Sequence, residues 1–133
     1  MSSSPKQIVA DFYNSDFFNQ SENVEKYLHP EMELFWNART GFLHQNREEV
    51  LATTIEAGKS FDSVRAHITH LLEEGDTVTI RMTYFVSTIE APNEEFPVAH
   101  FFAIWEVKDG KLYKGYQMSQ PPEEEGDALT SWM

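Results

Sequence analysis

The residues of this sequence best suited to acid–base chemistry are its five histidines. Imidazole has the ordinary pKa closest to neutral pH, so a histidine inside a binding site can accept or donate a proton. His70 and His100 are the candidates for a catalytic base, because each lies among apolar residues on a strand-like segment. Either could serve if its face is the inner one, with Glu33 or Asp62 as the partner carboxylate. The alternative is a histidine packed in a core or interface, with its ring nitrogens satisfied.

No metal site is expected. The sequence has no cysteine, and no His-x-x-x-His pair that would place two imidazoles on one side of a helix. His67 and His70 are close together, but a spacing of three on a regular strand sends two side chains to opposite faces. Phosphate-binding loops, nucleophile elbows and nucleotide fingerprints are also absent, and no cofactor is expected.

The first half of the sequence predicts three helices and a short strand. Ser4 and Pro5 form a helix start, with serine as the cap and proline at the first helical position. Apolar residues follow at helical spacing as far as Phe18. A second, short helix is expected over residues 21–29 and a third over 46–58, with a strand over 32–37 between them.

The second half is typical of β-structure. Apolar residues alternate over 64–72 and 78–86, and further strands are expected over 98–107 and 112–120. Asp109-Gly110 is a hairpin signal between the last two. The strand over 98–107 is apolar on both faces. Because only one face of the sheet can cover the helices, the other needs the C-terminal tail or another subunit, and a homodimer through the outer face is favoured.

Size and charge exclude several classes of function. A chain of 133 residues predicts a single domain over 1–133, with a core at about 6–120 and an acidic tail at 121–133. The net charge of −12 leaves no basic stripe for nucleic acid or for an anionic membrane surface. No apolar run approaches the roughly 18 residues of a membrane helix, and no signal peptide is expected from residues 1–5. The cytoplasm is the expected location, since there is no cysteine.

Several short motifs follow one another along the predicted core. They are Phe12-Tyr13, Leu28-His29-Pro30, Gly41 with Arg47-Glu48, Glu74-Gly75-Asp76-Thr77-Val78, and Asp109-Gly110-Lys111-Leu112. Their order and that of the elements resemble the nuclear transport factor 2-like superfamily and, within it, the SnoaL-like, polyketide cyclase-like domain. The resemblance implies an α+β cone, in which the N-terminal helices pack on a curved mixed or antiparallel sheet and leave an apolar pocket.

The resemblance also suggests what lines that pocket. The expected walls are aromatic and one amide is expected to supply hydrogen bonds; these residues are Tyr13, Trp36, Phe85, Phe101, Trp105 and Gln117. The alternative for the aromatic residues is plain core packing. A small apolar or amphiphilic molecule is the expected partner.

The acid–base residues of similar enzymes are missing from the matching positions. Similar ketosteroid isomerases have a carboxylate base, a tyrosine and a protonated aspartate, where this sequence has Trp36, Phe12 and Ala103. Tyr13 fits the tyrosine position after a one-residue slip. A pocket histidine of the cyclases also falls at Ala103. The sequence therefore predicts a ligand-binding protein, with two alternatives: a cyclase- or dehydratase-type lyase or isomerase that uses a pocket histidine, or a protein-interaction adaptor.

Overall fold

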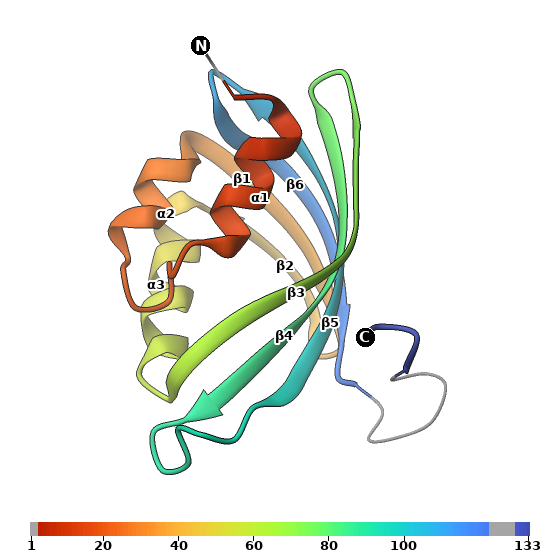
Figure 1. Ribbon diagram of the computed structural model, residues 1–133. Helices are drawn as coiled ribbons and strands as arrows, with labels where there is room; N and C mark the ends of the chain where they lie inside the picture. The colour runs from red at the N-terminus through yellow and green to blue at the C-terminus, as the bar shows by residue number, and fades with distance from the viewer. Residues whose placement is uncertain (1–2, 123–129) are drawn as a thin grey trace.

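A computed structural model describes residues 3–122 and 130–133 of the chain. In chain order the elements are α1 (Pro5–Asn14), α2 (Glu22–Tyr27), β1 (Leu28–Ala38), β2 (Gly41–Asn46), α3 (Arg47–Gly58), β3 (Phe61–Glu74), β4 (Thr77–Thr88), β5 (Phe96–Lys108) and β6 (Lys111–Gln120). The helices lie on one side of a strongly curved sheet (Figure 1). The predicted α+β class is thus confirmed. Most of the predicted tail, residues 123–129, lies outside the described residues.

The helix starts follow the sequence signals. The Ser4 side chain accepts a hydrogen bond from the backbone N–H of Gln7, and Asn46 and Glu49 form a reciprocal capping box at the start of α3. The predicted first helix was too long, because α1 ends at Asn14. The backbone turns extended at Ser15, whose hydroxyl donates to the carbonyl of Phe12 at 2.6 Å. This local bond competes with the next helical turn.

Within the described residues the sheet has six strands in the order β2-β1-β6-β5-β4-β3. β1 and β6 are parallel, and every other neighbouring pair is antiparallel. The sequence does not predict β2, because Thr40-Gly41 indicates an end of the β-structure there. Gly41, at a φ of 132°, instead joins β1 and β2 as a hairpin in which Ala38 pairs with Gly41. β2 is a largely exposed edge strand, so it carries no alternation of burial.

The core lies between the helices and the concave face of the sheet. α1 buries Val9, Phe12 and Tyr13, and α2 buries Val24. On the sheet side, Ile80 and Met82 of β4 are completely buried. Burial of this apolar surface is the main force that holds the helices on the sheet. No helix in the described residues is long and apolar enough to span a bilayer.

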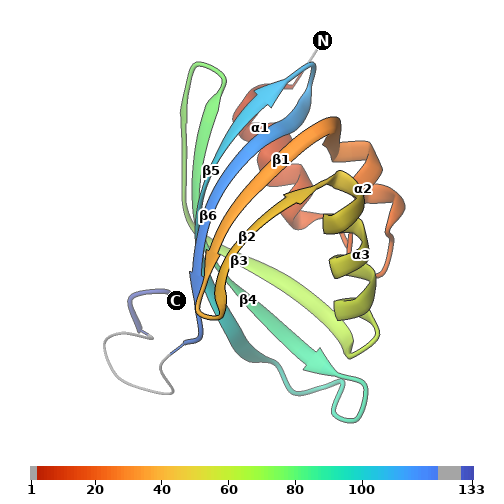
Figure 2. The same ribbon diagram turned by 180° about the vertical axis from the view of Figure 1, so that it is seen from behind.

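None of the three described helices lies on the convex, outer face of the sheet (Figure 2). The chain end returns to this face, where the Trp132 ring stacks on His100 with ring centroids 4.3 Å apart. The Arg81 guanidinium lies 3.6 Å from the centre of the same indole, and Phe102 meets it edge-on. Strand β5, which is apolar on both faces, therefore has one of its two expected partners, the C-terminal tail. The homodimer stays a prediction.

Candidate functional site

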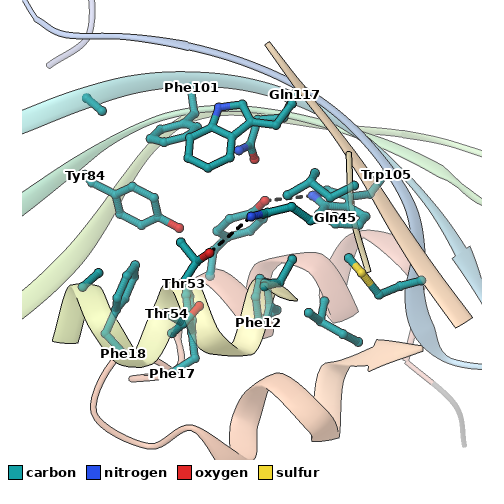
Figure 3. A pocket seen from close by; sticks show the side chains of 18 of the residues that line it. Phe12, Phe17, Phe18, Gln45, Thr53, Thr54, Tyr84, Phe101, Trp105 and Gln117 are labelled. Atoms are coloured by element: carbon teal, nitrogen blue, oxygen red, sulfur yellow. Dashed lines mark hydrogen bonds between the residues drawn. The ribbon is translucent and has the colours of Figure 1, made fainter. Parts of the chain in front are cut away.

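A cavity of about 230 Å³ lies between the helices and the concave face of the sheet. Its lining is almost entirely apolar and comes from both halves of the chain (Figure 3). The lining residues are Phe12, Tyr13, Phe17, Phe18, Leu28, Met32, Leu34, Trp36, Gln45, Val50, Thr53, Thr54, Ala57, Tyr84, Val98, Ala99, Phe101, Trp105 and Gln117. The cavity is the interior of the cone that the curved sheet and the helices enclose.

A chain of aromatic rings in mutual contact forms one wall of the cavity. Phe12 at the end of α1 stacks on Phe17, with centroids 4.5 Å apart, and Phe17 lies at the same distance from Phe18. Phe18 then meets Tyr84 of β4 edge-on at 5.7 Å, and Tyr84 meets Phe101 of β5 in the same way at 5.1 Å. The early end of α1 at Asn14 places Phe17 and Phe18 in the following turn. Such offset and edge-on contacts give the wall defined positions rather than a fluid surface.

The polar groups of the cavity are few. The indole N–H of Trp105 donates to the hydroxyl of Tyr13 at 2.8 Å, and both side chains are buried. The Gln45 amide donates to the Thr53 hydroxyl at 3.2 Å. The amide of Gln117 has no hydrogen-bond partner within the described part of the chain. Sparse polar groups in an apolar cavity are what fixes the orientation of a bound molecule.

The two tyrosines that line the cavity keep their protons. Burial raises the pKa of Tyr13 far above its usual range, although the hydrogen bond from Trp105 acts in the opposite direction. Burial also raises the pKa of Tyr84, and the nearby Tyr13 raises it further. At neutral pH both residues are therefore neutral phenols that can donate a hydrogen bond.

No aspartate, glutamate, histidine, lysine or arginine is among the described residues that line the cavity. A general acid or base works best when its pKa lies near the working pH, and neither cavity tyrosine meets that condition. The described residues also contain no group of three or more histidines and carboxylates placed to hold a metal ion. By its own side chains, the cavity can enclose, orient and hydrogen-bond a molecule.

Five of the six predicted pocket residues line the cavity: Tyr13, Trp36, Phe101, Trp105 and Gln117. Phe85 does not, and its prediction as a wall needs correction. Ile80, Met82 and Tyr84 point to the core side of β4, so regular alternation turns Phe85 to the outer side. There it lies beneath Arg65, 4.8 Å from the guanidinium, and edge-on to His67.

His70 and His100 do not meet the condition set for a catalytic base, because neither lines the cavity. His100 lies on the outer face, where Nδ1 is 2.7 Å from the Thr83 hydroxyl and the ring stacks on Trp132. Its Nε2 is buried without a partner within the described residues. Burial lowers the pKa of His100, and the charge of Arg81 lowers it further. The proposed partner carboxylates are absent from the cavity too: Glu33 lies 3.2 Å from His44, and Asp62 is exposed.

His70 is exposed for a reason that the sequence does not reveal. The ladder between β3 and β4 shifts between Ile68 and His70, so His70 pairs with Arg81 while His67 pairs with Thr83. Directly paired residues share a face, and Arg81 and Thr83 are two positions apart. His67 and His70 therefore lie on the same face of the sheet. The expectation of opposite faces was wrong because this β-bulge adds one residue.

Several cavity residues had no predicted role in the site. Tyr84 was visible as part of the alternation of β4, and Phe17 and Phe18 as part of the first apolar stripe. Gln45 could not be found, because it belongs to the unpredicted strand β2. Thr53 carried no signal, since an isolated threonine on a helix is usually a surface residue.

Comparisons with known proteins agree with this architecture. Residues 9–114 match the SnoaL-like domain family, and no curated protein sequence matches the chain. Among solved structures, wild-type IdmH, a putative polyketide cyclase from Streptomyces antibioticus, is 18% identical with a TM-score of 0.69, covering 88% of this chain and 92% of IdmH. A nuclear transport factor 2-like protein of unknown function from Burkholderia pseudomallei is 18% identical with a TM-score of 0.61, covering 86% and 89%.

An epoxide hydrolase from M. tuberculosis, described as LEH-like, is 14% identical with a TM-score of 0.67, covering 86% of this chain and 81% of that one. At these identities the likeness concerns the fold alone, and that fold hosts more than one chemistry. The six-stranded mixed sheet with its helices is the cone of nuclear transport factor 2-like proteins. Since the family match extends over most of the sequence, the chain belongs to the SnoaL-like family.

Proposed function

We propose that this protein binds a small, largely apolar molecule inside its cone and performs no acid–base chemistry on it with its own side chains. One observation carries the proposal: the cavity is walled by aromatic rings in mutual contact, and none of the described lining residues titrates near neutral pH. The alternative of a pocket-histidine lyase or isomerase lacks its base, since His70 and His100 lie outside the cavity. No observation favours the adaptor.

The volume of the cavity limits the size of the ligand. An apolar protein cavity of about 150 Å³ is large enough for benzene. At about 230 Å³ this cavity accommodates a molecule of roughly two fused rings. Flat or nearly flat molecules suit it best, because Phe18, Tyr84 and Phe101 present ring faces and edges to the same space.

Filling the cavity is also favourable for the protein. An apolar space leaves its lining atoms without contact partners on one side, so a cavity destabilises a fold in proportion to its volume. A chain selected only for stability would close this space with larger side chains at Ala57 or Ala99, which both line it. Keeping small residues there is consistent with a space meant for another molecule.

The test uses tetralin, a neutral two-ring hydrocarbon, in isothermal titration calorimetry. With about −0.5 kcal/mol per non-hydrogen atom, we expect a dissociation constant on the order of 100 μM. Ala57→Phe places a ring in the cavity and is expected to weaken binding at least about tenfold. Ala52→Phe is the matched control, because Ala52 lies on the exposed side of the same helix α3 and does not line the cavity.

Saturable binding that is lost in Ala57→Phe and kept in Ala52→Phe supports the proposal. Absence of saturable binding to the wild type, or equal binding by both variants, contradicts it.

We also propose that the protein forms a homodimer through the outer face of the sheet. Ile104 pairs with Tyr116 and Phe102 pairs with Met118, so these four side chains form one apolar patch across β5 and β6. All four are at least 43% exposed, which is unusual for a contiguous group of large apolar side chains. A second copy offers the same patch, and a twofold axis brings the two together. The cytoplasm stays the predicted location.

A further inference from the structure

The hydrogen-bonding capacity of Tyr13 is only partly used. Its oxygen accepts the indole N–H of Trp105 at 2.8 Å, and this is the hydrogen bond that fixes the phenol in the core. A phenol also has one proton to donate. Within the described residues nothing accepts that proton, although Tyr13 lines the cavity. The unused O–H group is therefore available to a molecule in the cavity.

Tyr84 contributes a second unused donor to the same cavity. Its ring is held edge-on by Phe18 and by Phe101, at 5.7 and 5.1 Å between centroids. Figure 3 shows its hydroxyl directed into the space that these residues enclose. The hydroxyl has no hydrogen-bond partner in the described part of the chain. Tyr84 is half-buried and lines the cavity.

The two hydroxyls serve the same space. Tyr13 of α1 and Tyr84 of β4 both line the one cavity. Both phenols stay protonated at neutral pH because both are buried. A buried donor without an acceptor costs free energy, so two of them facing one cavity call for a common acceptor.

The chemistry of that acceptor follows from what the cavity lacks. A carbonyl oxygen has two lone pairs and no proton, so it can accept hydrogen bonds from both phenols at once. A carboxylate or phosphate would need a cation, and no lysine or arginine lines the cavity among the described residues. The acceptor is therefore neutral.

We infer that the molecule bound in the cone carries a neutral carbonyl oxygen, and that the hydroxyls of Tyr84 and Tyr13 donate hydrogen bonds to it. The inference rests on the proposed binding function and adds the chemical class of the ligand. The hydrogen bond from the Trp105 N–H polarises the Tyr13 hydroxyl, so Tyr13 is the stronger of the two donors. The hydrogen bonds then run from the indole through the phenol to the carbonyl oxygen.

The test compares two probes of the same shape, 1-tetralone and 1-methylenetetralin, which differ only in a carbonyl against a C=CH₂ group. In calorimetry, wild type is expected to bind the ketone about tenfold more tightly than the alkene. Tyr84→Phe keeps the ring and is expected to reduce this preference to less than about threefold, while alkene binding stays unchanged and reports an intact fold. Tyr27→Phe is the matched control, because Tyr27 does not line the cavity.

A second readout follows the carbonyl itself. In infrared difference spectra the C=O stretch of bound 1-tetralone is expected to shift to lower frequency in wild type and in Tyr27→Phe. In Tyr84→Phe and in Tyr13→Phe part of the shift is expected to be lost.

Three results would overturn the inference. Equal binding of ketone and alkene by wild type is the first, and it leaves the proposed function standing if both bind. The second is a ketone preference that survives Tyr84→Phe and Tyr13→Phe but is lost in Gln117→Leu, because the amide would then be the carbonyl's partner. If neither probe binds, the inference and the proposed function fail together.

Discussion

At the scale of single residues, the wall of the cavity depends on a glycine that touches no ligand. Gly115 of β6 lies directly opposite Trp105 of β5 in the ladder. A Cβ atom at this position would lie 2.6 Å from Cη2 and Cζ3 of the indole, closer than side-chain carbons approach. The indole therefore crosses the backbone of β6 on its way to Tyr13. Glycine is required here for space, and not for an unusual backbone conformation.

Gly115→Ala is expected to lower the free energy of unfolding by about 1–3 kcal/mol, because an added methyl forces the packed indole to move. Urea denaturation measures the loss. In the Trp105→Phe background the same change is expected to cost less, since the smaller ring leaves room. Equal costs in the two backgrounds would mean that the indole is not what the methyl meets.

His100 predicts a dependence of stability on pH. Its pKa is lowered in the folded protein by burial and by the charge of Arg81, so the unfolded chain binds the proton more readily. The neutral imidazole stabilises the fold above the ordinary pKa of about 6.5, and this contribution is lost as the pH falls below that value toward the lowered pKa. Urea denaturation between pH 5 and 7.5 should show a weaker loss of stability at low pH in His100→Asn than in wild type. A difference between the two proteins that is the same at every pH would contradict this account.

At the scale of the elements, the local signals predicted the helix starts and the long strands well. Ser4, Pro5 and Asn46 each act through neighbours two to three residues away, so the sequence alone contains the whole interaction. Strand β2 and the bulge of β3 were missed for the opposite reason. Both are defined by the partner strand, and neither an exposed edge strand nor an extra unpaired residue leaves a periodic pattern.

The same contrast applies to the candidate site. Aromatic residues of the predicted strand over 98–107, such as Phe101 and Trp105, were found from the sequence. Phe85 was misplaced although it adjoins Tyr84, because neighbouring residues of a strand point to opposite faces of the sheet. The faces of His70 and His100 depended on which side of the sheet the helices cover. That is a tertiary property, so the sequence could only state it as a condition.

The cap of α3 is expected to matter for binding as well as for folding. Asn46→Ala removes the acceptor of the Glu49 N–H and should reduce the free energy of unfolding by about 1 kcal/mol. Since Thr54 and Ala57 of α3 line the cavity, tetralin binding should weaken in parallel. Asn46→Asp, which keeps an acceptor, is the control for both measurements. If Ala and Asp behave alike in urea denaturation, the capping box does not stabilise the helix.

At the scale of the whole molecule, the two faces of the sheet have different roles. The concave face and the helices enclose the cavity. The outer face, which none of the described helices covers (Figure 2), carries an apolar patch beside the docked Trp132. A net charge of −12 opposes association of two copies at long range, so a contact through this face has to come from apolar burial.

Ile104→Glu is expected to convert the proposed dimer into a monomer, because it would bury two carboxylates on a twofold interface. Sedimentation equilibrium reads out the mass. Ile89→Glu is the matched control, since Ile89 is 62% exposed but follows β4 in the turn away from the patch. A monomeric wild type, or a dimer that both variants keep, would contradict the assignment of this face.

The central claim is that the interior of the cone is a binding site, and its most direct test is a crystal structure of the protein grown with 1-tetralone. We expect electron density for the ligand inside the cavity, against the aromatic wall that includes Phe18, Tyr84 and Phe101, with the carbonyl at the Tyr84 hydroxyl. A structure with an empty cavity and the ligand on the outer face of the sheet, under conditions where calorimetry shows binding, would contradict it.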